Sequence, residues 1–173
     1  MVTARLGIRH KHNDNKFSIG SRSAKEFIVR ECERSEWAKF RRYHYLNTEI
    51  ATASVCYGLY DKNNIIGFMA VLHQPHGANK KIKRVSRLVI LPDYQGIGLG
   101  TKFLNVIAEY YKSKGYDFTI VTSAKNMIHA LRKSPKWIMT RYSANGCSSP
   151  KSTIDFNRKS IRSDCKTGGF KYR

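Results

Sequence analysis

The chain has 173 residues, and its 32 Lys and Arg against 12 Asp and Glu give a net charge of +20. This length predicts one domain whose core is large enough to be stable without disulfide or metal crosslinks. No apolar run reaches about 18 residues, so we expect no membrane-spanning helix, and the first residues have no apolar stretch of a secretory signal.

Residues 1–24 are polar and basic, and we predict a flexible arm there. We assign residues 25–173 to one domain that ends in a basic segment, 143–173. A first strand is expected at 26–32. Ser35 is expected to cap a helix from 36 to 46 with Trp37, Phe40 and His44 on its inner side. Strands at 54–60 and 65–72 then form a hairpin.

After a His- and Lys-rich loop at 73–81, the pattern predicts a strand at 82–91, a glycine turn, and a helix that Gly115 ends near Lys114. A strand at 116–122, a helix at 125–133, and strands at 136–141 and 169–172 complete the order. The fold class is therefore α/β (α+β): a central mixed, mainly antiparallel sheet of six to seven strands flanked by helices.

The glycine turn is Gln95-Gly96-Ile97-Gly98-Leu99-Gly100, and it joins an apolar strand to an amphipathic helix. A helix start presents unpaired N–H groups and a partial positive charge, and together they bind phosphate oxygens. Glycines let the backbone approach a ligand closely. The spacing fits neither the dinucleotide fingerprint nor the P-loop.

The pattern Gln95-x-x-Gly98-x-Gly100 after Leu91-Pro92-Asp93-Tyr94 resembles the acyl-CoA pyrophosphate loop of the GNAT acetyltransferase superfamily, as does the element order over 26–142. The resemblance implies that acetyl-CoA, or another acyl-CoA, donates its acyl group to an amine. The cofactor-binding positions it implies are Leu88, Val89, Ile90, Leu91, Gln95, Gly96, Ile97, Gly98, Leu99, Gly100, Thr101, Lys102 and Asn126.

The acid and base of the reaction stay open in the sequence. Arg132 stands where family members often have a Tyr that protonates the leaving thiolate, and the strand before the turn has no Glu base. A His is the ordinary base near neutral pH. The candidate catalytic residues are His44, Tyr45, Ser123 and Arg132.

We expect no metal site, because the four cysteines are scattered and His73 and His76 have no third ligand nearby. The scattered cysteines also favour a reducing cytoplasm, which would be the host's if the chain is encoded by a phage.

The basic excess favours a polyanionic partner, DNA or tRNA, over a membrane surface, since residues 131–173 alone hold eleven basic and two acidic side chains. A basic protein is the other acceptor we consider, and a dimer is possible. The candidate nucleic-acid contacts are Arg41, Arg42, Lys80, Lys81, Arg141, Lys151, Arg158, Lys159 and Arg162.

The segments Trp37-x-x-Phe40-x-x-x-His44-Tyr45-Leu46 and Ser134-Pro135-x-Trp137 resemble a GNAT branch of phage and mobile-element proteins. A fainter resemblance connects the chain to phage Mom-like proteins, which modify DNA bases. The sequence predicts an N-acyltransferase that acts on a nucleic acid or a nucleic-acid-associated acceptor. The alternatives are a Mom-like base-modifying enzyme, a tRNA-acetylating toxin, and a non-catalytic nucleic-acid-binding protein on the same fold.

Overall fold

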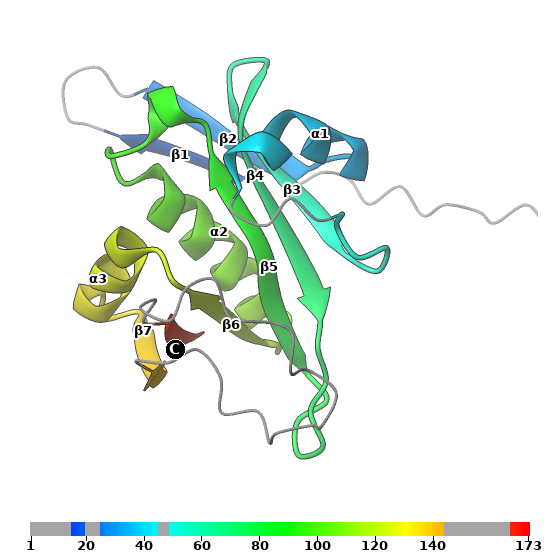
Figure 1. Ribbon diagram of the computed structural model, residues 1–173, viewed down its shortest axis with the longest axis vertical. Helices are drawn as coiled ribbons and strands as arrows, with labels where there is room; N and C mark the ends of the chain where they lie inside the picture. Colours follow the sequence, from blue (N-terminus) through cyan, green and yellow to red (C-terminus); the bar gives the residue numbers. More distant parts are fainter. Residues whose placement is uncertain (1–14, 20–24, 45–48, 144–166) are drawn as a thin grey trace, which may run out of the picture.

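The computed structural model describes residues 15–19, 25–44, 49–143 and 167–173, which form one eight-stranded sheet flanked by helices (Figure 1). The strands run in the order β1-β2-β3-β4-β5-β6-β8-β7. Among the described strands, β5 and β6 alone pair in parallel, and the other neighbours are antiparallel. The predicted α/β domain with a mixed, mainly antiparallel sheet is confirmed.

The strands are β1 (Asn15–Ile19), β2 (Lys25–Glu31), β3 (Val55–Asp61), β4 (Asn64–His73), β5 (Ile82–Ile90), β6 (Asp117–Thr122), β7 (Trp137–Ser143) and β8 (Thr167–Tyr172). The α-helices are α1 (Trp37–Phe40), α2 (Leu99–Ser113) and α3 (Lys125–Lys133). Three 3₁₀ turns are η1 (Arg34–Glu36), η2 (Arg41–Tyr43) and η3 (Pro92–Tyr94). No helix in the described part of the chain is long and apolar enough to cross a membrane.

The larger core lies between the sheet and the helices α2 and α3. Phe103, Leu104 and Ile107 of α2 are at most 1% exposed, because the spacing of three and four residues places them on one face of the helix. Full burial of each such side chain stabilises the fold by about 1.5–3 kcal/mol. This core fixes α2, and therefore the turn that precedes it, against the sheet.

A smaller core lies on the opposite face, where Trp37 and Phe40 of α1 pack on Phe68 and Val89. Side chains alternate between the faces of a strand, so Phe68 points to α1 while its neighbour Met69 belongs to the α2 core. The helices thus cover both faces of the central strands (Figure 1).

The first helix differs from the prediction. The segment expected to be one helix from 36 to 46 is a single α-helical turn between two 3₁₀ turns, and Ser35 lies inside η1 without capping it. No side chain caps these turns, and only Trp37 and Phe40 are buried, so packing holds no more than one turn. Residues 45–48 lie outside the described residues.

The sheet has one strand more than the seven that the sequence predicts. Asn15–Ile19, within the segment expected to be a flexible arm, form β1 and pair antiparallel with β2. The rest of that segment, residues 1–14 and 20–24, lies outside the described residues. The strand expected at 169–172 exists as β8, and it lies between β6 and β7.

Candidate acyl-CoA and acceptor site

The site begins where the two parallel strands separate. β5 and β6 pair from Ile82 with Asp117 to Val85 with Ile120, and beyond that point they have no paired residues although both strands continue. The register of β5 against β4 shifts at Ser86, which is an extra residue between Val85 and Arg87. A bulge of this kind bends the strand and increases its twist. The bulge therefore turns the end of β5 away from β6 and opens a gap.

The backbone of β5 offers polar groups to this gap. Leu91 donates its N–H to Ile66 O of β4 at 2.9 Å. Because successive residues of a strand point their polar groups to opposite sides, Val89 also faces β4, whereas Leu88 and Ile90 face the gap. The side-chain amide of Gln95 donates to Ile90 O at 2.7 Å, which agrees with this direction. The N–H of Leu88 is thus directed into the gap.

The glycine turn presents bare backbone at the end of β5. Gly96 and Gly98 have φ of 83° and 81°, a left-handed conformation that L side chains rarely adopt. A Cβ on Gly96 would meet nothing within 4 Å, and one on Gly98 would meet only Thr101 Oγ1 at 3.9 Å. Space for a ligand is therefore open at both positions.

The start of α2 supplies the hydrogen-bond donors of this turn. Gly98 is the N-cap without a side-chain cap, and the first helical bond runs from Lys102 N–H to Gly98 O at 3.1 Å. The N–H groups of residues 99–101 have no acceptor inside the helix. Together with the helix dipole, they form a site of positive potential for an anion.

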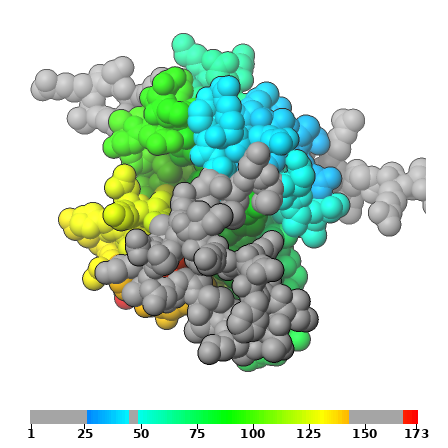
Figure 2. Space-filling view, in the orientation of Figure 1, coloured from blue at the N-terminus to red at the C-terminus, as the bar shows by residue number. Residues whose placement is uncertain are grey.

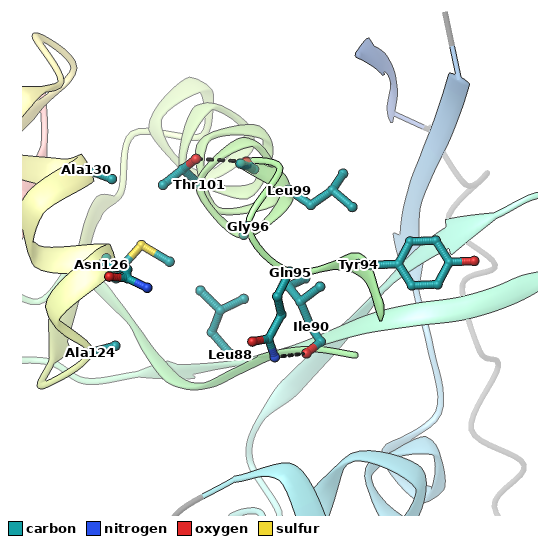
Figure 3. A pocket seen from close by; sticks show the side chains of 13 residues that line it. Leu88, Ile90, Tyr94, Gln95, Gly96, Leu99, Thr101, Ala124, Asn126 and Ala130 are labelled. Carbon is teal, nitrogen blue, oxygen red and sulfur yellow. Dashed lines mark hydrogen bonds between the residues drawn. The ribbon is translucent and has the colours of Figure 1, made fainter. Parts of the chain in front are cut away.

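A cavity of about 450 Å³ connects the glycine turn to α3 (Figure 3). Figure 3 shows Leu88 and Ile90 below the turn and Asn126 approaching from α3. Nine of the predicted cofactor-binding residues line it: Leu88, Ile90, Gln95, Gly96, Gly98, Leu99, Gly100, Thr101 and Asn126.

Four predicted cofactor-binding residues do not line this cavity. Val89 and Leu91 pack in the smaller core on the α1 side, because they have the opposite strand parity from Leu88 and Ile90. Ile97 is 56% exposed. Lys102 is also absent from the lining.

The sequence prediction missed four lining residues: Tyr94, Ala124, Met127 and Ala130. On α3, Ala130 follows Met127 by three positions and Asn126 by four. That helical spacing was the available signal that one face of α3 points toward the glycine turn.

A second cavity of about 290 Å³ occupies the gap between the strands, and it shares Leu88, Ala124 and Met127 with the first. His44 and Ser123, both predicted catalytic residues, line it together with Ser86 and Arg87. The imidazole of His44 lies edge-on to Trp37, with ring centroids 5.6 Å apart. The structure thus brings His44, which follows η2, to the end of the gap beside Ser123, although the two residues are far apart in the sequence.

The other two predicted catalytic residues are not placed there. Arg132 is exposed near the end of α3 and lines none of the cavities described here. Tyr45 lies outside the described residues. Besides His44 and Ser123, the polar side chains that line the second cavity are Ser86, Arg87 and Thr122, which were not among the predicted catalytic residues.

The predicted nucleic-acid contacts lie on several surfaces. Arg41 and Arg42 are exposed on η2, next to α1, and Lys80 and Lys81 are exposed between β4 and β5. Figure 2 shows the surface of α1, in cyan, next to the green surface around the start of α2. Arg141 lines a third cavity. Lys151, Arg158, Lys159 and Arg162 lie outside the described residues.

Two buried tyrosines among the described residues have strongly raised pKa values. Burial raises the pKa of Tyr111 to about 12 and also raises that of Tyr57, and both tyrosines belong to the larger core. The described part of the chain also groups no three His, Cys, Asp or Glu residues that could hold a metal ion.

The profile of the Acetyltransferase (GNAT) family matches residues 23–132. No curated protein sequence matches the chain. Among solved structures, the IAA acetyltransferase from Bacillus cereus ATCC 14579 superposes with a TM-score of 0.62 at 14% identity, over 84% of this chain and 98% of that one.

Two further structures have the same fold. A GNAT family acetyltransferase from Elizabethkingia anophelis, with acetyl-CoA bound, superposes with a TM-score of 0.61 at 14% identity, over 85% of this chain and 97% of that one. The ribosomal-protein-S18-alanine N-acetyltransferase from Escherichia coli superposes with a TM-score of 0.61 at 13% identity, over 84% of this chain and 92% of that one. At these identities the likeness concerns the fold.

Proposed function

The chain belongs to the Acetyltransferase (GNAT) family, and from that premise we propose that it binds acetyl-CoA, or another acyl-CoA, and transfers the acyl group to an amine. The observation that carries this proposal is the gap between β5 and β6, which begins beside the glycine turn and ends at His44 and Ser123. When bound, the CoA thioester would supply an acyl carbon open to attack by an amine.

The residues of the glycine turn fit the diphosphate of such a cofactor. The left-handed glycines leave the backbone bare, and the N–H groups of residues 99–101 would donate to phosphate oxygens. Gln95 holds the turn to the end of β5 through Ile90 O. This bond keeps the donors in place while the cofactor is absent, so little order has to be gained on binding.

The gap would orient the acyl end. The Leu88 N–H faces the gap, where it can donate to the oxygen on which negative charge develops. His44 is proposed to take a proton from the attacking amine, and the Ser123 hydroxyl to donate a hydrogen bond to the departing sulfur, which leaves as a thiolate and takes its proton from water. These roles for His44 and Ser123 rest on their place in the lining of the second cavity.

We propose further that the amine belongs to a nucleic acid or to a nucleic-acid-associated acceptor. The net charge of +20 supports this, as do the exposed cations Arg41, Arg42, Lys80 and Lys81. A DNA base, the amino group of an aminoacyl-tRNA and a lysine of a DNA- or RNA-bound protein are the acceptors to test. The relation to phage proteins, including the Mom-like enzymes, stays a prediction.

Calorimetry with acetyl-CoA tests the cofactor site with a matched pair of variants. Gly96 and Gly115 both have positive φ, of 83° and 75°, and a Cβ on either would meet nothing within 4 Å. Glu at either position should therefore cause similar backbone strain. We expect Gly96→Glu to abolish binding, since its carboxylate would repel the diphosphate, while Gly115→Glu binds as the unchanged protein does. Equal affinity of both variants would contradict the proposed cofactor site.

Mass spectrometry tests the acceptor. The protein is incubated with acetyl-CoA and, separately, with DNA, aminoacyl-tRNA and basic peptides, and each product is searched for a gain of one acetyl group. A gain on DNA or tRNA supports the proposed acceptor, and a gain on free peptides alone contradicts it. Binding of acetyl-CoA without transfer to any of them would favour the non-catalytic alternative.

A further inference from the structure

A third cavity, of about 620 Å³, lies over β5, β6, β8 and β7. Arg84 and Thr119, which line it, alternate with Val85, Phe118 and Ile120 of the larger core, so they point to the face of the sheet opposite α2. The cavity shares Ile120 and Val121 with the second cavity, which occupies the gap. It therefore adjoins the end of the gap where we place the acceptor amine.

Two arginines from distant parts of the sequence line this cavity, Arg84 on β5 and Arg141 on β7. Arg141 pairs with Gly169 of β8 across the strands. A Cβ on Gly169 would lie 2.7 Å from Arg141 Cγ and 3.3 Å from its Nε. The missing side chain at 169 thus lets Arg141 lie along the sheet surface, across β8.

Among the described residues, no carboxylate forms an ion pair with either arginine. Burial and the charge of Arg141 lower the pKa of Arg84, so the two guanidinium groups repel each other. Arg84 donates to a neutral acceptor, Gln74 Oε1, at 3.1 Å.

A neighbouring cation shows the contrast. Thr119 pairs with Arg84 on β5 and with Lys171 on β8, so Lys171 lies in the same row of the sheet as Arg84. The Lys171 ammonium lies 2.9 Å from a carboxylate oxygen of Asp117. Two unbalanced guanidinium groups in one concave surface form a site for an oxyanion, and planar guanidinium groups bind phosphate through paired hydrogen bonds.

We propose that Arg84 and Arg141 bind a phosphate group of the acceptor and so direct its amine into the gap between β5 and β6. The phosphate site itself does not depend on the proposed function. Its assignment to the acceptor of acyl transfer rests on that function. The phosphate can belong to a polynucleotide backbone or to a small phosphorylated amine, and the two sources share the same contacts.

The test measures binding of a fluorescent single-stranded oligonucleotide by the full chain, at one fixed ionic strength because such binding depends on salt. We expect Arg84→Gln and Arg141→Gln each to weaken binding about tenfold. Lys133→Gln removes one exposed positive charge from the end of α3 and should change the affinity less than twofold. Equal losses in all three variants would mean general charge attraction and would overturn the proposal.

A variant that keeps both arginines tests whether their position, and not only their charge, is needed for oligonucleotide binding. Gly169→Ala displaces the Arg141 side chain from its place on β8, and it should weaken binding while the circular dichroism spectrum is retained. Unchanged affinity of a folded Gly169→Ala protein would also overturn the proposal.

Competition by inorganic phosphate and by a nucleoside monophosphate distinguishes the two sources of the phosphate. Strong competition indicates a small phosphorylated ligand, and competition only by unlabelled oligonucleotide indicates a backbone. Calorimetry with acetyl-CoA separates this inference from the proposed function. If the unchanged protein binds acetyl-CoA normally and the arginine variants bind the oligonucleotide as well as it does, the phosphate site alone is contradicted. If the unchanged protein does not bind acetyl-CoA but the arginine variants still weaken oligonucleotide binding, the proposed function alone is contradicted.

Discussion

The hydroxyl groups of Tyr57 and Tyr111 lie 2.7 Å apart in the larger core and join β3 to α2 by a hydrogen bond. Both residues are at most 5% exposed. A buried hydroxyl that loses its partner keeps the cost of leaving water, which is about 1–3 kcal/mol. The pair therefore helps to hold the helix whose first turn carries the proposed diphosphate site.

Phenylalanine substitutions test this bond. We expect Tyr111→Phe to lower the free energy of unfolding by about 1–3 kcal/mol, because the Tyr57 hydroxyl stays buried without its partner. The double variant with Tyr57→Phe should cost less than the sum of the single changes. Urea denaturation measures all three, and strictly additive losses would contradict the coupling.

Alkaline pH should weaken the fold through the same pair. Burial raises the pKa of Tyr111 to about 12, above its ordinary value of 10, and raises that of Tyr57 further. A folded state that keeps its protons longer than the unfolded state loses stability as the pH rises between those values. We expect no contribution below about pH 10 and a steep loss toward pH 12. The double phenylalanine variant should show a shallower loss.

Gln95→Ala should weaken acetyl-CoA binding about three- to tenfold, which corresponds to one hydrogen bond. The side chain holds the glycine turn to Ile90 O at 2.7 Å, so its removal frees the turn without altering the helix donors. Calorimetry measures the change. Affinity that matches the unchanged protein would mean that the turn is held by other contacts.

His44→Asn should lower kcat about 10²- to 10⁴-fold and leave acetyl-CoA affinity within about twofold, if His44 is the base. His129→Asn is the matched control, because His129 is exposed on α3 and lines none of the three cavities. The measurement uses the acceptor that mass spectrometry identifies. Similar rates for the two variants would remove His44 from the reaction.

Arg141→Gln should raise the free energy of unfolding by about 0.2–1 kcal/mol at low salt, because it ends the repulsion with Arg84. The gain should fade in about 0.5 M salt. Thermal denaturation at both salt concentrations measures it. A loss of stability would indicate that Arg141 is paired rather than unbalanced.

Local signals in the sequence predicted most elements of the fold. The helix at 125–133 was predicted with its bounds, since an apolar face ends at Ser134-Pro135. Gly115, predicted to end the preceding helix, follows α2 with a φ of 75°. β1 was missed because the alternation of Phe17 and Ile19 with polar residues is short and stands in a polar, basic segment. The single turn of α1 depends on burial of two side chains, which periodicity alone does not reveal.

The site could be predicted only where it follows from a contiguous motif. Most of the glycine turn, which is such a motif, lines the first cavity. The shared position of Arg84 and Arg141 on the third cavity depends instead on the insertion of β8 between β6 and β7. Neither arginine lies in a local pattern that distinguishes it from the other cations of a strongly basic chain. Strand order is a tertiary property, and the sequence offered no sign of it there.

The position of β8 also has a consequence for co-translational folding. Thr167–Tyr172 follow every other described strand along the chain, yet they separate β6 from β7 inside the sheet. Phe170 and Tyr172 of β8 also belong to the core that fixes α2. A nascent chain on the ribosome therefore cannot complete either the support of its glycine turn or the surface that holds Arg141 until β8 has left the exit tunnel. Cofactor capture and phosphate recognition would mature together, at a late stage of synthesis.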